Sequence, residues 1–293
     1  MTTAPTVPPG TPYRPPAAAP ARFRQLLAAE WIKFWSLRST APVVAAGALT
    51  TLGICVNAAK ANADRLAHQP DLPSAPAGKQ DLPQMLYDPL TAAYVFPAWT
   101  LLVILVAALG ASTVFGEYTS GLIRTTFTAV PDRRAVVTAK AGVVTAVTLA
   151  LGGAVSGTSF GVTQAILRDH HGMSLGDPGA LRAVTASALL LPLCALVGMA
   201  VGALVRHAAG AVVSVVGLLL LVPQLLTGER YRWVKEIGNT MPLTAWERLI
   251  LPPGRDDDLG AYPVTVTEAW TVYGAWTAAA VAVAVLVVRH RDV

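Results

Sequence analysis

The chain has 293 residues, enough for one large domain or two small ones. Only 13% of the residues are Asp, Glu, Lys or Arg, and 54% are hydrophobic, whereas roughly 25% are charged in an ordinary soluble protein. This composition excludes disorder of the whole chain, a collagen-like repeat and a disulfide-linked scaffold. It indicates a protein whose surroundings are largely lipid.

Two different segments precede the first long apolar stretch. Residues 1–20 are rich in proline and contain no acid, so we expect a disordered tail. Residues 22–38 place large apolar side chains, two tryptophans among them, on one side of a helical wheel, with Lys33 among the polar residues opposite. This pattern predicts an amphipathic helix in the headgroup region of a membrane; a simple extension of the first span is the alternative. Glu30 falls within the apolar arc, so it needs a basic partner from elsewhere in the protein or from another subunit.

Six stretches without Asp, Glu, Lys, Arg or His are long enough to cross a bilayer, which takes about 20 apolar residues. They are residues 41–59, 91–115, 141–167, 183–205, 208–226 and 269–288. Soluble proteins rarely contain so many uninterrupted apolar runs, and spanning strands would alternate polar and apolar residues. We therefore predict an all-α integral membrane protein, with one six-span transmembrane domain over residues 21–293.

Six spans place both termini on the same side of the membrane. With the termini in the cytoplasm, the inner segments carry a net charge of +8 and the outer segments −3, although basic residues alone are divided only twelve to ten. We therefore predict a multi-pass protein of the cell membrane with both termini cytoplasmic. The net charge of +5 follows from this topology and indicates no nucleic-acid partner.

The six spans contain no ionisable side chain, which argues against a proton- or sodium-coupled transporter, a membrane-embedded protease and a metal channel. Small residues recur instead in the third and fourth spans, at Gly153, Gly157, Gly161, Gly198 and Gly202. This spacing lets helix backbones approach closely, either within the chain or, as the alternative, between subunits. Pro192 and Pro223 predict kinks in the fourth and fifth spans.

No motif in the chain indicates covalent chemistry or a cofactor. Cys55 and Cys194 fall in different apolar spans and are interpreted as small hydrophobic residues. His170, His171 and the acidic run 256–258 lack metal-ligand spacing and are interpreted as parts of charged loops. Phosphate-binding, serine-hydrolase and zinc-protease motifs are absent. The sequence therefore predicts a non-catalytic protein without a cofactor or metal.

The connection between the second and third spans, residues 116–140, is longer than a simple turn requires. Residues 120–130 have helical spacing of apolar side chains, and Asp132 can cap a following helix. That helix can continue from 133 to 167, about 52 Å, and so project beyond the bilayer core.

The charged residues of this connection suggest two different roles, one toward lipid and one toward a partner protein. Arg133, Arg134 and Lys140 flank the entry of the third span and can pair with lipid phosphates. Glu117 has no such role toward lipid, and it suggests a docking site for a cytoplasmic partner.

The same connection resembles the membrane subunit of an ATP-binding-cassette (ABC) transporter of the type-2 exporter family. That family has a Gly-Glu pair, a G-x-x-R-x-x stretch, a Pro-x-Arg and a Lys entering the third span. In this chain these fall on Gly116, Glu117, Gly121, Arg124, Pro131, Arg133 and Lys140. AAEWIKFWSLRST at 28–40, NTMPLTAWERL at 239–249 and the closing RHRDV add to the resemblance, which covers all but the proline-rich tail.

The resemblance implies a complex of two six-span subunits, identical or different, with two copies of a cytoplasmic ATPase subunit. It implies that the N-terminal helix and the segment 116–140 couple the ATPase to the spans. The implied coupling residues are Glu30, Glu117, Tyr118, Gly121, Arg124 and Arg133. It also implies that part of the outer loop 227–267, with Pro242 and Trp246, forms short re-entrant helices that close the exit path. Trp233 and Trp246 are expected to be exposed at the headgroups.

The leading hypothesis is therefore a permease subunit that exports a substrate with energy from a partner ATPase. Because the spans carry no charged site, we expect an apolar or amphipathic substrate. The alternative is a membrane anchor or signalling protein that docks a cytoplasmic partner without moving a substrate. A secondary transporter is disfavoured by the lack of charge within the spans.

Overall fold

The computed structural model describes residues 22–36, 40–68, 88–130, 132–170, 172–226, 231–255 and 261–290. Within these ranges the chain forms helices joined by turns and irregular links, with no β-strand. The predicted disordered tail, Pro131, His171 and the acidic run 256–258 lie outside the described residues.

Six helical segments are long and apolar enough to cross a membrane. They are α2 (Thr40–His68), α4 with α5 (Pro89–Ala93 and Phe96–Thr119), α7 (Arg133–Ile166), α8 (Ala180–Val205), α9 with η1 and α10 (Ala208–Val216, Gly217–Leu221 and Val222–Leu225) and α13 (Val266–His290). The predicted all-α fold with six spans is confirmed. Each end of a span either lies within one residue of the predicted end or extends beyond it.

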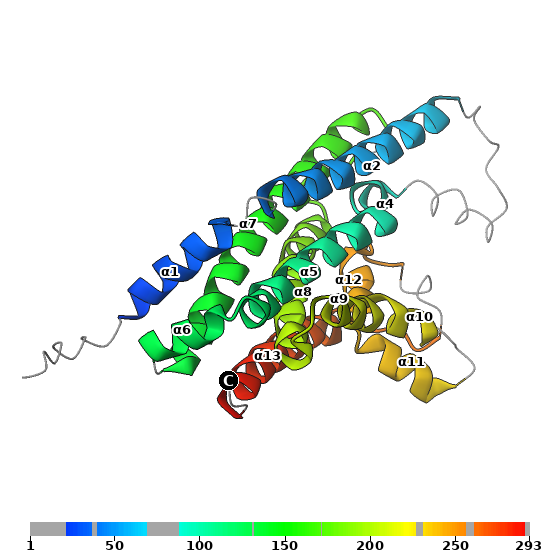
Figure 1. The fold of residues 1–293 in the computed structure, drawn as a ribbon. Coiled ribbons are helices and arrows are strands. Elements are labelled where there is room, and N and C mark those ends of the chain that lie inside the picture. Colours follow the sequence, from blue (N-terminus) through cyan, green and yellow to red (C-terminus); the bar gives the residue numbers. More distant parts are fainter. Residues whose placement is uncertain are drawn as a thin grey trace, which may run out of the picture.

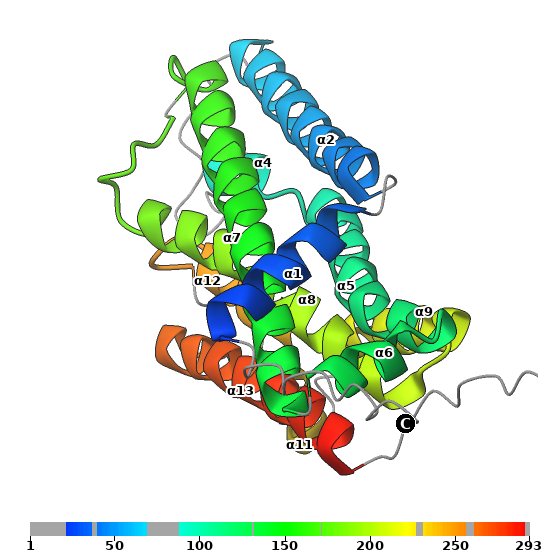
Figure 2. The ribbon, with the colours of Figure 1, turned by 60° about the vertical axis from the view of Figure 1, so that its left-hand side comes forward.

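Among the described residues, the helices outside the spans are α1 (Phe23–Ser36), α6 (Leu122–Ala129), α11 (Arg232–Asn239) and α12 (Pro242–Ile250). The helix α6 joins α5 to α7 at one end of the bundle, whereas α11 and α12 lie at the opposite end (Figure 1). We call these the α6 end and the α12 end. The predicted N-terminal helix is confirmed as α1, which crosses α7 obliquely (Figure 2).

The helix α8 occupies the centre of the bundle, where it packs against α5, α7, α12 and α13. A Cβ atom added to Gly198 would lie 1.9 Å from the carbonyl oxygen of Ala107, and one added to Gly110 would lie 1.9 Å from that of Ala195. Only glycine fits such an approach, so α5 and α8 are held together by backbone contact. The predicted close packing at Gly198 is therefore intramolecular.

The glycines predicted to allow close packing in the third span do not lie at a helix contact within the described chain. Nothing lies within 4 Å of a Cβ added to Gly153, Gly157 or Gly161, because this side of α7 faces away from the rest of the chain. The contact between α7 and α8 is made by Gly152 instead, where an added Cβ would lie 2.3 Å from the carbonyl oxygen of Ala188.

The second span is interrupted at Tyr94 and Val95, between α4 and α5, which the uninterrupted apolar sequence did not predict. Side chains of α7 satisfy backbone carbonyls on α4. The Ser159 hydroxyl donates to the carbonyl of Ala93 at 2.6 Å, and the Gln164 amide donates to that of Pro89 at 3.0 Å. Lipid offers no hydrogen bonds, so carbonyls freed by a break in a span need partners of this kind.

The two prolines predicted to kink spans are accommodated in different ways. Pro192 lies inside the continuous helix α8. Pro223 lies two residues after the end of the π-helix η1, where the N–H of Val222 donates to the carbonyl of Gly217 five residues earlier. Proline lacks an N–H and crowds the carbonyl four residues before it, so a wider turn is a common relief. The fifth span is thus distorted beside Pro223, and the predicted kinks at the two prolines stay predictions.

Candidate functional site

The predicted coupling segment forms a sharp corner at the α6 end of the bundle. The helix α5 continues through Gly116 to Thr119. Gly121 adopts a left-handed conformation with φ of 73°, which favours glycine, and α6 starts immediately after it. The carboxylate of Asp132 accepts the N–H groups of Arg134 and Ala135, as predicted for a helix cap.

The helix that follows this cap is long. Its 34 residues correspond to about 51 Å, more than the roughly 30 Å of a bilayer core. The predicted long third helix is confirmed, and it gives α1 a surface on which to pack.

One stripe of α1 faces α7. Leu26, Glu30 and Phe34, spaced four residues apart, are buried. The helical wheel grouped Trp31 and Trp35 with these residues, but both indoles are exposed. The helix thus has a narrow stripe against the protein and exposed aromatic side chains beside it, as expected of a helix at a membrane surface.

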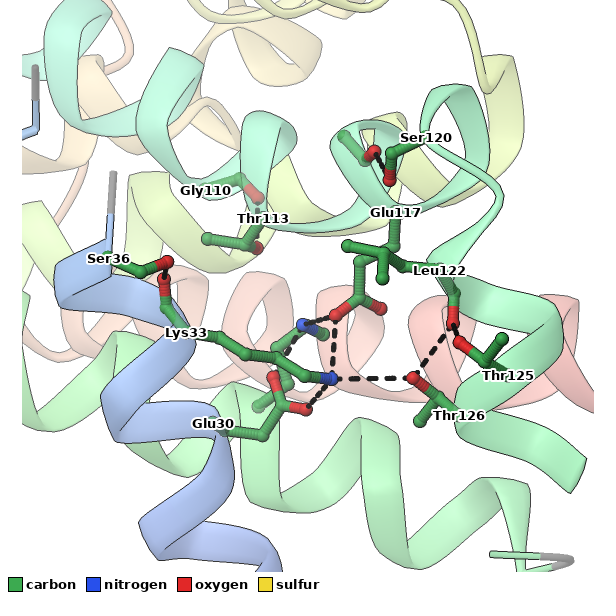
Figure 3. Close-up of polar contacts among 12 residues, drawn as sticks. Glu30, Lys33, Ser36, Gly110, Thr113, Glu117, Ser120, Leu122, Thr125 and Thr126 are labelled. Carbon is green, nitrogen blue, oxygen red and sulfur yellow. Dashed lines mark hydrogen bonds and ion pairs between the residues drawn. The ribbon is translucent and has the colours of Figure 1, made fainter. Parts of the chain in front are cut away.

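Glu30 belongs to a cluster of four charged side chains contributed by α1, α5 and α7 (Figure 3). The ammonium of Lys140 lies 2.5 Å from a carboxylate oxygen of Glu30 and 2.9 Å from one of Glu117. The ammonium of Lys33 lies 2.8 Å from Glu30 and 3.0 Å from Glu117. Each lysine therefore bridges both carboxylates, and we refer to these four residues as the ion cluster.

The ion cluster reaches α6 through Lys33. Its ammonium donates to the hydroxyl of Thr126 at 3.5 Å, so α6 is connected to α1 by a side-chain contact. Glu117, on the last turn of α5, is in turn joined to α1 and α7. The cluster thus links α1, α5, α6 and α7 at this end.

Because the ion cluster is largely buried, the loss of one of its charges is expected to destabilise the protein. Glu30 and Lys140 are only 5% and 7% exposed, and leaving one buried charge without its partner costs roughly 3–5 kcal/mol. The side chain of Lys33 is 37% exposed. Burial lowers the pKa of Lys33, but its hydrogen bond to Glu30 and the charges of Glu117 and Glu30 outweigh this effect and raise the pKa. Lys33 therefore stays charged at neutral pH.

A cavity of about 260 Å³ adjoins the ion cluster between α1, α5 and α7. Its wall includes the apolar side chains of Phe34, Val143 and Val144 beside the polar Ser112 and Thr113. The cluster therefore has open space on one side, and its side chains can move without displacing a packed neighbour.

The structure gives different outcomes for the charged residues singled out from the sequence. The basic partner that Glu30 required is confirmed and comes from within the chain, as Lys140 and Lys33. Pairing of Lys140 with lipid phosphates is wrong, because Lys140 is buried between two carboxylates. Glu117 is bonded inside the protein, and its contact with an ATPase stays a prediction. The role of Lys33 was missed, since the wheel placed it on the polar side.

Tyr118 takes part in a second contact at the α6 end. The guanidinium carbon of Arg206, at the end of α8, lies 4.4 Å from the centre of the Tyr118 ring. Arg206 has a left-handed backbone with φ of 54°. Nε and Nη2 of Arg206 and the hydroxyl of Tyr118 are buried without a hydrogen-bond partner. This cation–π contact joins α5 to α8, and it could not be predicted from the sequence because Arg206 is 88 positions further along the chain.

The remaining coupling residues lie outside the ion cluster. Gly121 forms the turn before α6, Arg124 lies on α6, and Arg133 begins α7. The structure thus brings Glu30 and Glu117 together and arranges the other predicted residues along the adjoining corner.

At the α12 end, the residues predicted as an outer gate are buried. Pro242 is the first residue of α12, and Trp246 is 0% exposed. The indole N–H of Trp246 donates to the hydroxyl of Ser187 at 2.9 Å, and its ring lies 5.8 Å from that of Trp99. Exposure of Trp246 at the headgroups is therefore wrong, because α12 turns this side chain into the bundle. Trp233 is 61% exposed, as predicted.

Arg182 of α8 attaches the end of α12 to the bundle. Its guanidinium donates to the carbonyl of Leu249 at 3.0 Å and to that of Leu251. Carbonyls at a helix end lack partners within the helix, and a cation there also suits the helix dipole. Of the short helices described between the fifth and sixth spans, α12 is thus fixed against α8.

No family model matches the chain, and no curated protein is detectably similar to it. In the part of the chain that the structure describes, no three His, Cys, Asp or Glu side chains are grouped so that they could hold a metal ion. The candidate site is therefore defined by its geometry: an ion cluster joining four helices at one end, and a buried tryptophan under a short helix at the other.

Proposed function

We propose that the chain is the permease subunit of a type-2 ABC exporter. In this proposal it pairs with a second permease subunit and with two copies of a cytoplasmic ATPase, and it moves an apolar or amphipathic substrate across the cell membrane. ATP is hydrolysed by the partner, and this chain is non-catalytic. The observation that carries the proposal is the ion cluster, which connects α6 to three longer helices.

A partner that pushes on α6 would move several helices together. The helix is connected covalently to α5 and α7 and through Lys33 to α1. Leu122, Thr125 and Thr128 on α6 are exposed and offer a surface for docking. An energy-supplying subunit requires such a connection, whereas a passive anchor does not. In the proposed orientation, α6 and both termini face the cytoplasm.

The α12 end fits the role of an outer gate. The short helix α12 lies between two spans and packs against α8 and α13, so its displacement would open a path beside the central helix. Pro242 and Trp246 are the gate residues of this proposal. Trp246 fills the space next to Trp99 and would have to leave it when α12 moves.

The test is co-expression with a candidate ATPase encoded beside this chain. We expect the two proteins to copurify and to support ATP-dependent uptake of an amphipathic fluorescent dye into inside-out vesicles. Arg124→Glu on α6 should lower this uptake by on the order of tenfold, since one lost interaction of 1.4 kcal/mol has that effect. Arg232→Glu on the exposed helix α11 is the matched control and should leave uptake unchanged.

The two functional hypotheses give opposite results in this experiment. Copurification without ATP-dependent uptake would favour a membrane anchor or signalling protein. Uptake driven by an ion gradient in the absence of ATP would contradict the exporter proposal and favour a secondary transporter.

A further inference from the structure

A small cavity lies at the α12 end, between the beginning of α5, the end of the fifth span and α12. Its volume is about 120 Å³. The residues that line it are Phe96, Thr100, Leu220, Pro223, Gln224, Leu243, Thr244 and Glu247. Pockets for drug-sized molecules usually enclose roughly 300–1,000 Å³. This outer pocket therefore has room for one end of a molecule.

The polar groups of the outer pocket include two without a hydrogen-bond partner among the described residues. The hydroxyl of Thr100 is buried and unpaired. Glu247 is an exposed residue of the pocket wall, and no described residue forms a hydrogen bond or an ion pair with its carboxylate. Buried polar atoms in folded proteins nearly always have partners, so an unpaired hydroxyl facing a cavity indicates a missing one.

The chemistry of the lining selects for positive charge. Glu247 supplies a carboxylate, and the hydroxyls of Thr100 and Thr244 can accept hydrogen bonds. The ring of Phe96 adds an aromatic face, which attracts cations. None of the described residues that line the pocket is basic.

We propose that the outer pocket binds the ammonium group of a cationic amphipathic substrate, with Glu247 as its counter-ion. This inference rests on the proposed function, and it names the substrate class within the apolar and amphipathic molecules considered above. The alkyl or aromatic body of the substrate would remain outside the pocket, in lipid or in the path between the spans.

The electrostatics of Glu247 make binding dependent on pH. Glu247 keeps an exposed surface, but partial burial of its carboxyl among the pocket walls raises the pKa to about 7, and the charge of Lys235 on α11 partly opposes this effect. The walls from α5, η1 and α10 contribute no ionisable group, and Arg182 of α8 is bonded to the carbonyls of α12. The carboxyl thus loses its proton as the pH rises through about 7, while an alkylamine, like lysine with a pKa of about 10.4, stays charged. Binding should strengthen with pH across this range.

The experiment uses the full-length permease in nanodiscs of phosphatidylcholine, with empty nanodiscs as the blank. The probe is a decylamine that carries a fluorescent dansyl group, and its N-acetylated analogue is the neutral control. We expect the amine to bind on the order of tenfold more tightly than the amide. Its affinity should rise from about pH 6 to about pH 8, as the carboxylate forms.

Variants assign the effect to the pocket. Glu247→Gln should remove the preference for the amine and flatten its pH profile, and Thr100→Val should weaken amine binding with the pH profile preserved. Glu236→Gln, which removes a carboxylate from the exposed helix α11, is the matched control and should change neither. Equal binding of amine and amide, or an unaltered pH profile in Glu247→Gln, overturns the proposal. If Glu247→Gln fails to fold, Thr100→Val and the wild-type pH profile decide the outcome.

This inference and the exporter proposal can fail separately, because binding requires no ATPase. Amine binding that depends on Glu247, without ATP-driven uptake, would support the pocket and contradict the exporter. ATP-driven uptake of the amine that is unchanged in Glu247→Gln would support the exporter and overturn the pocket.

Discussion

Lys140 lies where α1, α5 and α7 meet, and its ammonium is bonded to two carboxylates away from solvent. Replacing it with methionine would leave Glu30 buried with half of its counter-charge. We expect Lys140→Met to lower the free energy of unfolding by roughly 3–5 kcal/mol. Unfolding by SDS in mixed dodecylmaltoside micelles measures this change.

A second lysine in the same cluster provides the control. Lys33→Met should cost less than Lys140→Met, because the side chain of Lys33 is 37% exposed and water stabilises charges near it. The double variant Glu30→Gln/Lys140→Met should be more stable than Lys140→Met alone. Equal losses for the two lysines would contradict the buried position of Lys140.

For single residues, the sequence predicted some of the contacts and not others. The position of Glu30 among apolar residues predicted a basic partner, since burying an unpaired charge is very costly. Its identity was hidden, because Lys140 is 110 positions away and looked like an ordinary basic residue at a membrane boundary. The predicted exposure of Trp246 was wrong for a related reason. A tryptophan in a loop suits the headgroups, and only the orientation of α12 reveals that this one is buried.

The helices α5 and α8 approach each other so closely that their backbones touch where Gly110 and Gly198 lie. A methyl group at Gly198 would overlap the carbonyl of Ala107, and the backbone cannot yield as a flexible side chain would. We expect Gly198→Ala to destabilise the protein by about 1–3 kcal/mol through overpacking. Thermal unfolding in detergent measures the effect.

Gly157 of α7 is the matched position, since nothing lies near an added Cβ there. Gly157→Ala should leave the stability of the isolated subunit unchanged or slightly raised, because alanine favours helix. A loss as large as that at Gly198 would mean that α7 packs against something that the single chain does not contain.

Hydropathy predicted the spans well, because any helix surrounded by lipid needs a long apolar sequence. It could not predict the break at Tyr94 and Val95, where the sequence stays apolar and only the polar groups of α7 make the interruption acceptable. Small-residue spacing predicted the packing at Gly198 but not which side of α7 faces inward. That choice depends on how the neighbouring helices surround α8.

For the whole molecule, the predicted orientation can be tested by labelling cysteines. Cys55 and Cys194 are 0% exposed, so a membrane-impermeant maleimide should not react with the unaltered folded protein. Thr125→Cys on α6 and Ser174→Cys in the turn before α8 place exposed thiols at opposite ends of the bundle. In intact cells we expect labelling at Ser174→Cys alone, and at Thr125→Cys only after permeabilisation.

The labelling result bears directly on the charge argument from the sequence. The orientation rested on an asymmetry of +8 against −3, much of it due to acids that contribute little to insertion. Labelling of Thr125→Cys from outside intact cells would reverse the topology and separate α6 from any cytoplasmic ATPase.

The central position of α8 also has a consequence for the synthesis of the protein. The helices α5 and α7 precede α8 in the chain and barely contact one another, because each packs mainly on α8. Until the fourth span enters the membrane, the surface of α5 around Gly110 lacks its final neighbour. Lys140, Ser159 and Gln164 of α7, by contrast, already have their partners on α1, α4 and α5. The newly made first three spans, together with α1, can therefore form the ion cluster among themselves, and the insertion of α8 is the step that covers the faces of α5 and α7 that it packs against.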